Sequence, residues 1–140
     1  MPALTLDSHN RDQAKAWLDS GSWVIACLCA AWCGTCREYR DGFDALAARH
    51  PDKHFLWIDI EDQADVVGDF DVENFPTMLI QRGNTVVFFG TVLPDQRLAE
   101  RLLLAQVEKD DAQILTEAAS SAERREWQDD FNLRARLDEA

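Results

Sequence analysis

Short apolar runs that are rich in β-branched and aromatic residues predict buried strands along this chain. The run WVIACLCA spans residues 23–30, and HFLWIDI spans residues 54–60. NFPTMLIQ, residues 74–81, predicts a third strand with a proline near its start, and TVVFFG, residues 85–90, predicts a fourth. The tight turn RGN separates these two runs, so the third and fourth strands are expected to pair as an antiparallel hairpin.

Apolar residues spaced three and four positions apart predict helices between the strands. We expect one helix over residues 11–20 with Ser8 as its N-cap, one over residues 37–50 and one over residues 94–107. Residues 61–70 predict a short helix or turn. The resulting order indicates an α/β fold, in which a mixed central sheet of four to five strands is flanked by helices on both faces.

The character of the sequence changes after residue 107. Residues 108–140 carry ten acidic and five basic residues, contain no proline or glycine, and keep a thin apolar stripe. We expect one or two helices there, broken near Ser120, where SSAE resembles a capping box. The pattern divides the chain into a domain at 1–107 and an acidic helical C-terminal extension at 108–140. Two interpretations of the stripe stay open: packing on the domain, or a surface for self-association or for a protein partner.

Charge and hydropathy limit the kinds of partner and the location that we expect for the protein. Its 140 residues include 26 acidic and 14 basic ones, and the net charge of −12 repels nucleic acid and anionic membrane surfaces. No run approaches the roughly 20 apolar residues that a membrane span needs. The first residues, MPALTLDSHNRDQ, lack the basic and apolar regions of a secretory signal, so a cytoplasmic location is expected. In that compartment a Cys-x-x-Cys pair is more often catalytic or metal-binding than structural.

Cys33 and Cys36 form such a pair, directly after the first strand and at the start of the next helix. Unpaired N–H groups and the helix dipole favour negative charge at this place, and hence the thiolate of Cys33, which is the nucleophile of disulfide exchange. Cys36, one helical turn further, lies close enough to close a disulfide. We therefore expect Cys33 to attack a substrate disulfide and Cys36 to resolve the mixed disulfide. Arg37 and Arg40 follow on the same helix. Neighbouring acidic residues offset their positive charge, so we expect the two arginines to lie on a solvated face.

Cys27 and Cys29 precede this pair in the apolar strand, so the four cysteines form the pattern C-x-C-x3-C-x2-C. Two residues apart in a strand, Cys27 and Cys29 share one face at a spacing of about 6.6 Å. That arrangement suits inert thiols packed in a core better than it suits a shared zinc ion. We predict no metal, and a zinc site stays open as the minor alternative.

The segment WCGTC at residues 32–36, placed after an apolar strand, resembles the active-site motif of the thioredoxin family. Phe75-Pro76-Thr77, about forty residues downstream, resembles the cis-proline loop of that family. The resemblance covers residues 4–107, with further matches at Asp59, Glu61, Gly83 and Gly90. It implies the thioredoxin fold and a cis peptide bond before Pro76, facing the two cysteines. It also implies a substrate groove, which is lined by Trp32, Gly34, Thr35, Phe75, Pro76 and Thr77.

Two positions depart from the family pattern. Where thioredoxins usually carry a buried aspartate, this chain has Cys27, and Trp57 stands where a lysine commonly pairs with that aspartate. Losing the pair is expected to slow proton transfer from Cys36 or to leave it to water. Cys27 and Trp57 are therefore assigned as modulating residues, and Cys27 also as a candidate third redox thiol near Cys36.

Together these features predict a protein thiol–disulfide oxidoreductase, acting in the direction of disulfide reduction in cell redox homeostasis. No bound cofactor is needed, because the redox-active disulfide Cys33–Cys36 itself carries two electrons. The expected partners are protein disulfide substrates and an upstream reductase. The alternative is a binding or scaffold module of the same fold, which holds a protein partner with its acidic helical tail.

Overall fold

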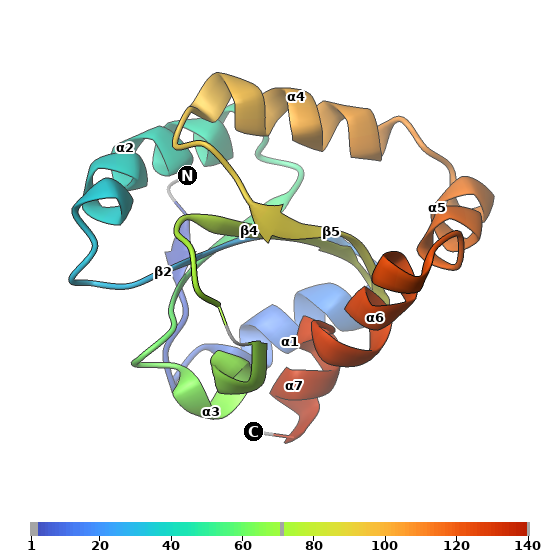
Figure 1. Ribbon diagram of the computed structural model, residues 1–140, viewed down its shortest axis with the longest axis horizontal. Coiled ribbons are helices and arrows are strands. Elements are labelled where there is room, and N and C mark those ends of the chain that lie inside the picture. The colour runs from blue at the N-terminus through green and yellow to red at the C-terminus, as the bar shows by residue number, and fades with distance from the viewer. Residues whose placement is uncertain (1–2, 71, 140) are drawn as a thin grey trace.

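A five-stranded mixed sheet lies at the centre of the molecule, between two layers of helices (Figure 1). The structure is a computed structural model that describes residues 3–70 and 72–139. The first residue of the predicted domain 1–107 and the last residue of the predicted extension 108–140 therefore lie outside the described residues. The strand order is β1-β3-β2-β4-β5. The strands are β1 (Leu4–Thr5), β2 (Trp23–Cys29), β3 (His54–Asp59), β4 (Thr77–Arg82) and β5 (Thr85–Thr91).

β2 is the central strand, which explains why its sequence is apolar throughout. It runs parallel to β3 and antiparallel to β4, so both of its edges are paired. Its side chains alternate between two cores: Ile25, Cys27 and Cys29 lie in the first, and Val24, Ala26 and Leu28 lie in the second. Because helices cover both faces, no position along the strand is left for a polar side chain.

Helices from both halves of the chain form these two layers. They are α1 (Arg11–Asp19), α2 (Gly34–Arg49), α3 (Ala64–Val67) and α4 (Gln96–Val107), with a 3₁₀ turn, η1 (Gly68–Phe70), after α3. α2 and α4 supply Phe43 and Leu103 to the first core, whereas α1 and α3 supply Leu18 and Val66 to the second. Figure 1 shows α2 and α4 on one side of the sheet, and α1 and α3 on the opposite side. This is the mixed α/β arrangement that the sequence predicts.

The edge strand β1 is not predicted from the sequence, because two residues carry no periodicity. Leu4 lies beside Leu56 of β3 in a parallel pairing. Arg40 of α2 fixes this segment by donating hydrogen bonds to the carbonyl oxygen of Ala3, at 3.1 Å, and to the hydroxyl of Thr5, at 2.9 Å. The N-terminal segment is therefore held by a long-range contact with the helix that follows the cysteines.

The described part of residues 108–140 forms three helices, rather than the one or two predicted. They are α5 (Asp111–Ala118), α6 (Ala122–Asp130) and α7 (Leu133–Glu139). The additional break falls at Asn132, whose side-chain oxygen accepts hydrogen bonds from the N–H of Ala135 and from the amide of Gln81. The apolar stripe faces the domain, because its main members are buried: Ile114, Trp127, Leu133 and Leu137. α5 and α6 pack against β5, and α7 packs against α1 and α3.

Two helix starts differ from the sequence prediction. Asn10 rather than Ser8 is the N-cap of α1. Ser121, one residue after the predicted position, caps α6 through its hydroxyl and no capping box forms there. A capping box does exist at the start of α5, where the side chains of Asp110 and Gln113 each accept a hydrogen bond from the backbone N–H of the other. The cap residues are local, but the choice among neighbouring candidates depends on how the chain enters each helix.

Candidate active site

Cys33 lies at the junction between the carboxyl end of β2 and the start of α2. It is the N-cap of α2, with φ −84° and ψ 115°, and its N–H bonds the carbonyl oxygen of Ala30 in a tight turn at 3.0 Å. The side chain is half-buried, so the sulfur stands at the rim of the fold. The N-cap position places it beside the first backbone N–H groups of α2, although its side chain accepts no hydrogen bond from them.

Cys36, in the first turn of α2, points into the first core and is only 1% exposed. Its disulfide partner in the structure is Cys29, the last residue of β2, with 5.8 Å between the two Cα atoms. The predicted couple Cys33–Cys36 is therefore not the one that is closed here, and Cys33 is a free thiol. The reason is orientation: Cys29 and Cys36 are buried together within the first core, whereas Cys33 is only partly buried and packs against its edge. The prediction that Cys29 is an inert thiol is wrong.

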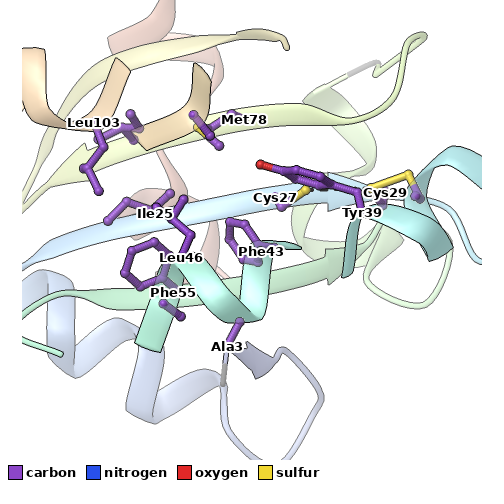
Figure 2. Packing of buried hydrophobic residues seen from close by; sticks show 14 of the residues in the cluster. Ala3, Ile25, Cys27, Cys29, Tyr39, Phe43, Leu46, Phe55, Met78 and Leu103 are labelled. Atoms are coloured by element: carbon purple, nitrogen blue, oxygen red, sulfur yellow. Dashed lines mark hydrogen bonds between the residues drawn. A yellow bond between two sulfur atoms is a disulfide. The ribbon is translucent and has the colours of Figure 1, made fainter. Parts of the chain in front are cut away.

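Cys27 lies two residues before Cys29 on the same face of β2, as Figure 2 shows. Its sulfur is 3.8 Å from that of Cys29, and the side chain is fully buried. Burial raises the pKa of the Cys27 thiol well above its ordinary value, and the positive charge of Arg40 opposes this by less. Tyr39 packs in the same core; burial also raises its pKa, and no described residue pairs with its hydroxyl. Cys27 is thus a neutral thiol in an apolar environment.

The Phe75–Pro76 segment leads into β4, which pairs with β2. The Phe75–Pro76 peptide bond is cis. Thr77, the residue after Pro76, lies opposite Leu28, the residue before Cys29, and the two form the last pair of the antiparallel register. The loop therefore adjoins the end of the strand from which the cysteines begin.

Trp32 and Phe75 meet above this junction. Their rings are in edge contact, with centroids 5.5 Å apart, and Trp32 remains 65% exposed. The indole N–H of Trp32 donates to the carboxylate of Glu61. Gly34 and Thr35 are exposed at the start of α2. The predicted groove residue Thr77 is different, because it is 3% exposed and its hydroxyl donates to the carbonyl oxygen of Asn74.

A hollow of about 350 Å³ opens beside Cys36. Trp57 lies in its wall, and the guanidinium of Arg40 covers the Trp57 ring with 5.0 Å to its centroid. Arg37 also lines the hollow and donates to the carbonyl oxygen of Ala31 at 2.7 Å. The expectation of a solvated face is therefore confirmed for Arg37, which is exposed, and wrong for Arg40, which is partly buried. The spacing contains a signal for Arg40, because a residue four positions after Cys36 shares its face of the helix.

Asp59, at the end of β3, ties the loop that carries the cysteines to the neighbouring strand. One carboxylate oxygen accepts the N–H of Ala31 at 2.9 Å, and the other accepts the N–H groups of Glu61 and Asp62 at 2.9 and 3.1 Å.

Among residues 3–70 and 72–139, no group of three or more His, Cys, Asp or Glu side chains is arranged to hold a metal ion. No helix in these ranges is both long and apolar enough to cross a membrane.

Fold and site together define a thioredoxin-fold protein with a Cys-x-x-Cys centre at the start of a helix. The chain belongs to the thioredoxin family, because the family model described as Thioredoxin matches residues 4–104. The C-terminal helices α5 to α7 lie outside that match.

Curated relatives and solved structures agree with this assignment. The chain is 33% identical to an H-type thioredoxin of Oryza sativa subsp. indica over 80 residues, 54% of this chain and 66% of that protein. It is 31% identical to a thioredoxin of Ophiophagus hannah over 79 residues, 56% of this chain and 75% of that protein. The crystal structure of a wild-type poplar thioredoxin h has a TM-score of 0.69 at 20% identity, over 79% of this chain and all of that one.

The matched part spans less than two thirds of several relatives: 66% of the rice protein and 63% of an H-type thioredoxin of Brassica campestris. None of these matches favours the alternative of a scaffold module. The apolar stripe on which that alternative depends is buried against the domain at Trp127, Leu133 and Leu137.

Proposed function

We propose that this protein is a thiol–disulfide oxidoreductase that acts on protein disulfides through Cys33 and Cys36. The observation that carries the proposal is the position of Cys33: a half-buried thiol that caps a helix, with Cys36 one turn further and buried. Cys33 attacks a substrate disulfide and forms a mixed disulfide. Cys36 then attacks Cys33, which releases the reduced substrate thiol and leaves a Cys33–Cys36 disulfide.

The substrate segment binds across the surface that Trp32, Gly34, Thr35 and Phe75 form beside Cys33. Trp32 and Phe75 offer apolar ring surface, and Gly34 adds no side chain that would hinder an approaching chain. On the other side lies the bent segment at residues 74–76 that leads into β4, in which Pro76 is buried, and we propose that its backbone pairs with an extended peptide. Thr77 supports this segment from within, through its hydrogen bond to Asn74.

The proposed direction is reduction of substrate disulfides in the cytoplasm, where thiols are kept reduced. An upstream reductase returns the electrons, and no bound cofactor or metal is needed, because the dithiol carries two electrons. Cys27 and Trp57 modulate the site. With Cys27 buried and neutral in place of a carboxylate, the proton of Cys36 leaves by another path, and the hollow beside Cys36 gives water access to it.

Insulin reduction with dithiothreitol, followed by turbidity, tests the proposal. Cys33→Ser removes the attacking sulfur, so its rate should fall to that of dithiothreitol alone, while wild type is faster by tenfold or more, about 1.4 kcal/mol in barrier or greater. Leu115→Ser, an exposed position on α5, is the control with the same introduced side chain and should keep the wild-type rate. Equal rates for wild type and Cys33→Ser would remove the assignment, provided that circular dichroism shows both to be folded.

A further inference from the structure

Four sulfur atoms gather where β2 ends and α2 begins, one more pair than simple exchange chemistry requires. Cys29 and Cys36 form a disulfide with a Cα–Cα distance of 5.8 Å, inside the usual range of about 4.4–6.8 Å. The sulfur of Cys27 lies 3.8 Å from that of Cys29, and Cys33 is free and half-buried. The strand cysteine Cys29 thus bonds the cysteine that is also proposed to resolve substrate disulfides.

Cys36 has two sulfur neighbours that it can reach in turn. Cys33 precedes it by three residues at the same helix start, and residues at that spacing on a helix lie about 5–6 Å apart at their Cβ atoms. Cys29 approaches from the sheet side, where its carbonyl oxygen is held by the N–H of Ile60 at 2.9 Å. A change of partner therefore needs rotation of side chains at Cys36 and its neighbours, whereas the two elements that carry them stay paired and packed.

Building on the proposed Cys33–Cys36 couple, we propose that Cys29 is a second disulfide partner of Cys36, and that the oxidised protein exchanges internally between the two disulfides. Cys29 loses its proton and its sulfur attacks that of Cys36. The Cys29–Cys36 bond forms while the Cys33–Cys36 bond breaks, and Cys33 leaves as a thiolate that takes up a proton. One disulfide is consumed and one is made, so no electrons enter or leave and no outside oxidant takes part.

Burial gives the two isomers different properties. Cys29 and Cys36 are each 1% exposed, so an outside thiol attacks the sulfur atoms of the Cys29–Cys36 disulfide slowly. The faster route to reduction of that isomer is for Cys33 to attack Cys36 and restore the Cys33–Cys36 disulfide. Meanwhile Cys33 is a free thiol at the surface without a resolving partner, so a mixed disulfide formed there persists. The internal exchange therefore keeps the protein oxidised in the buried Cys29–Cys36 form, and it stops disulfide exchange with substrates until Cys36 is free again.

Thiol labelling of the oxidised wild-type protein tests the exchange without any substitution. Protein oxidised with diamide is desalted and treated under native conditions with a maleimide–polyethylene glycol. The Cys29–Cys36 isomer should gain one adduct at Cys33. The Cys33–Cys36 isomer should gain none, because its two free thiols, Cys27 and Cys29, are both buried. Mass spectrometry of the tryptic peptide 16–37, which holds all four cysteines, then locates the label. Oxidised protein in which Cys33 is never labelled would overturn the proposal.

Matched variants separate Cys29 from its neighbour. Cys29→Ser should lose the single adduct, whereas Cys27→Ser, on the same face of the same strand, should keep it. In Cys33→Ser, diamide should still close Cys29–Cys36, and reduction of that disulfide by dithiothreitol should be at least tenfold slower than reduction of the oxidised wild type. Cys33→Ser protein that shows three free thiols when it is oxidised with diamide and then labelled in denaturant would contradict the proposal. Because no step uses a substrate, this test can fail while insulin reduction succeeds, and the reverse also holds.

Discussion

Arg40 illustrates how a single side chain changes meaning once its surroundings are known. It lies one helical turn after Cys36, covers the ring of Trp57, forms an ion pair with Asp44 and bonds the N-terminal segment. Trp57 occupies the position where the family commonly has a lysine, and Arg40 brings a cation to the same wall from α2. A positive charge is thus present beside Cys36, although it comes from a different element.

His54 gives a residue-scale prediction on pH. Its ring stacks on Trp17 with centroids 4.2 Å apart, and burial lowers its pKa from the ordinary 6.5. The unfolded chain therefore binds a proton at a higher pH than the folded protein. The stability that neutral His54 contributes is complete above about pH 6.5 and is lost as the pH falls below it.

Urea unfolding measures the effect at several pH values, from about one unit above the ordinary histidine pKa of 6.5 to about 1.5 units below it. The free energy of unfolding should fall more steeply with decreasing pH in wild type than in His54→Gln. His9→Gln, at an exposed position, serves as the control and should keep the wild-type slope. Parallel slopes for wild type and His54→Gln would show that His54 is not the group that titrates.

At the scale of elements, the outer edge of the sheet at β5 is covered by α6. The side-chain amide of Gln128 accepts the N–H of Val86 at 2.8 Å and donates to its carbonyl oxygen at 2.7 Å, as a neighbouring strand would. Exposed strand edges can pair with other chains, and covering them with a helix is one way to prevent this. The C-terminal extension therefore closes the sheet at this edge.

Gln128→Ala should lower the free energy of unfolding by about 1–3 kcal/mol, because it leaves two partly buried backbone groups of Val86 unpaired. Gln13→Ala, at an exposed glutamine of α1, is the matched control and should change the value by less than about 0.5 kcal/mol. Urea unfolding measures both. An equal effect of the two substitutions would mean that the Gln128 bonds contribute nothing to stability.

At the scale of the whole molecule, we propose that the segments 1–107 and 108–140 fold as one unit. The second core contains residues from both: Leu18 and Val66 lie in it together with Trp127 and Leu133. Polar contacts add to this, since Gln81 of β4 accepts the N–H of Leu133 at 2.8 Å. Ile114 of α5 also lies in the first core, so the extension contributes to the cores on both faces of the sheet.

Truncation after Val107 should remove the cooperative unfolding of the protein or cause it to aggregate, because it uncovers the second core and the edge of β5. The full chain should unfold in a single transition when followed both by circular dichroism and by tryptophan fluorescence. The opposite result, a truncated chain as stable as the full one, would define the extension as a dispensable appendage.

Much of the fold is predictable from short stretches of sequence. β2 to β5 and α1, α2 and α4 are found close to where the apolar pattern sets them, because periodicity reports which face of each element is buried. The position of Cys33 at a helix start is likewise local. The missed features are of another kind: β1 is too short to show a pattern, and the break at Asn132 depends on its bond to Gln81, which is remote in the chain.

The amino-acid sequence by itself determined the longer strands and helices, the two buried faces of the sheet and a pair of cysteines one turn apart, because each depends on neighbours within a few residues. Only the tertiary structure decided that Cys29 faces Cys36, that Arg40 covers Trp57 and that the tail seals the sheet. These contacts depend on how a strand and a helix are oriented toward each other. Such orientation is settled by packing between segments far apart in the chain, and short-range patterns do not encode it.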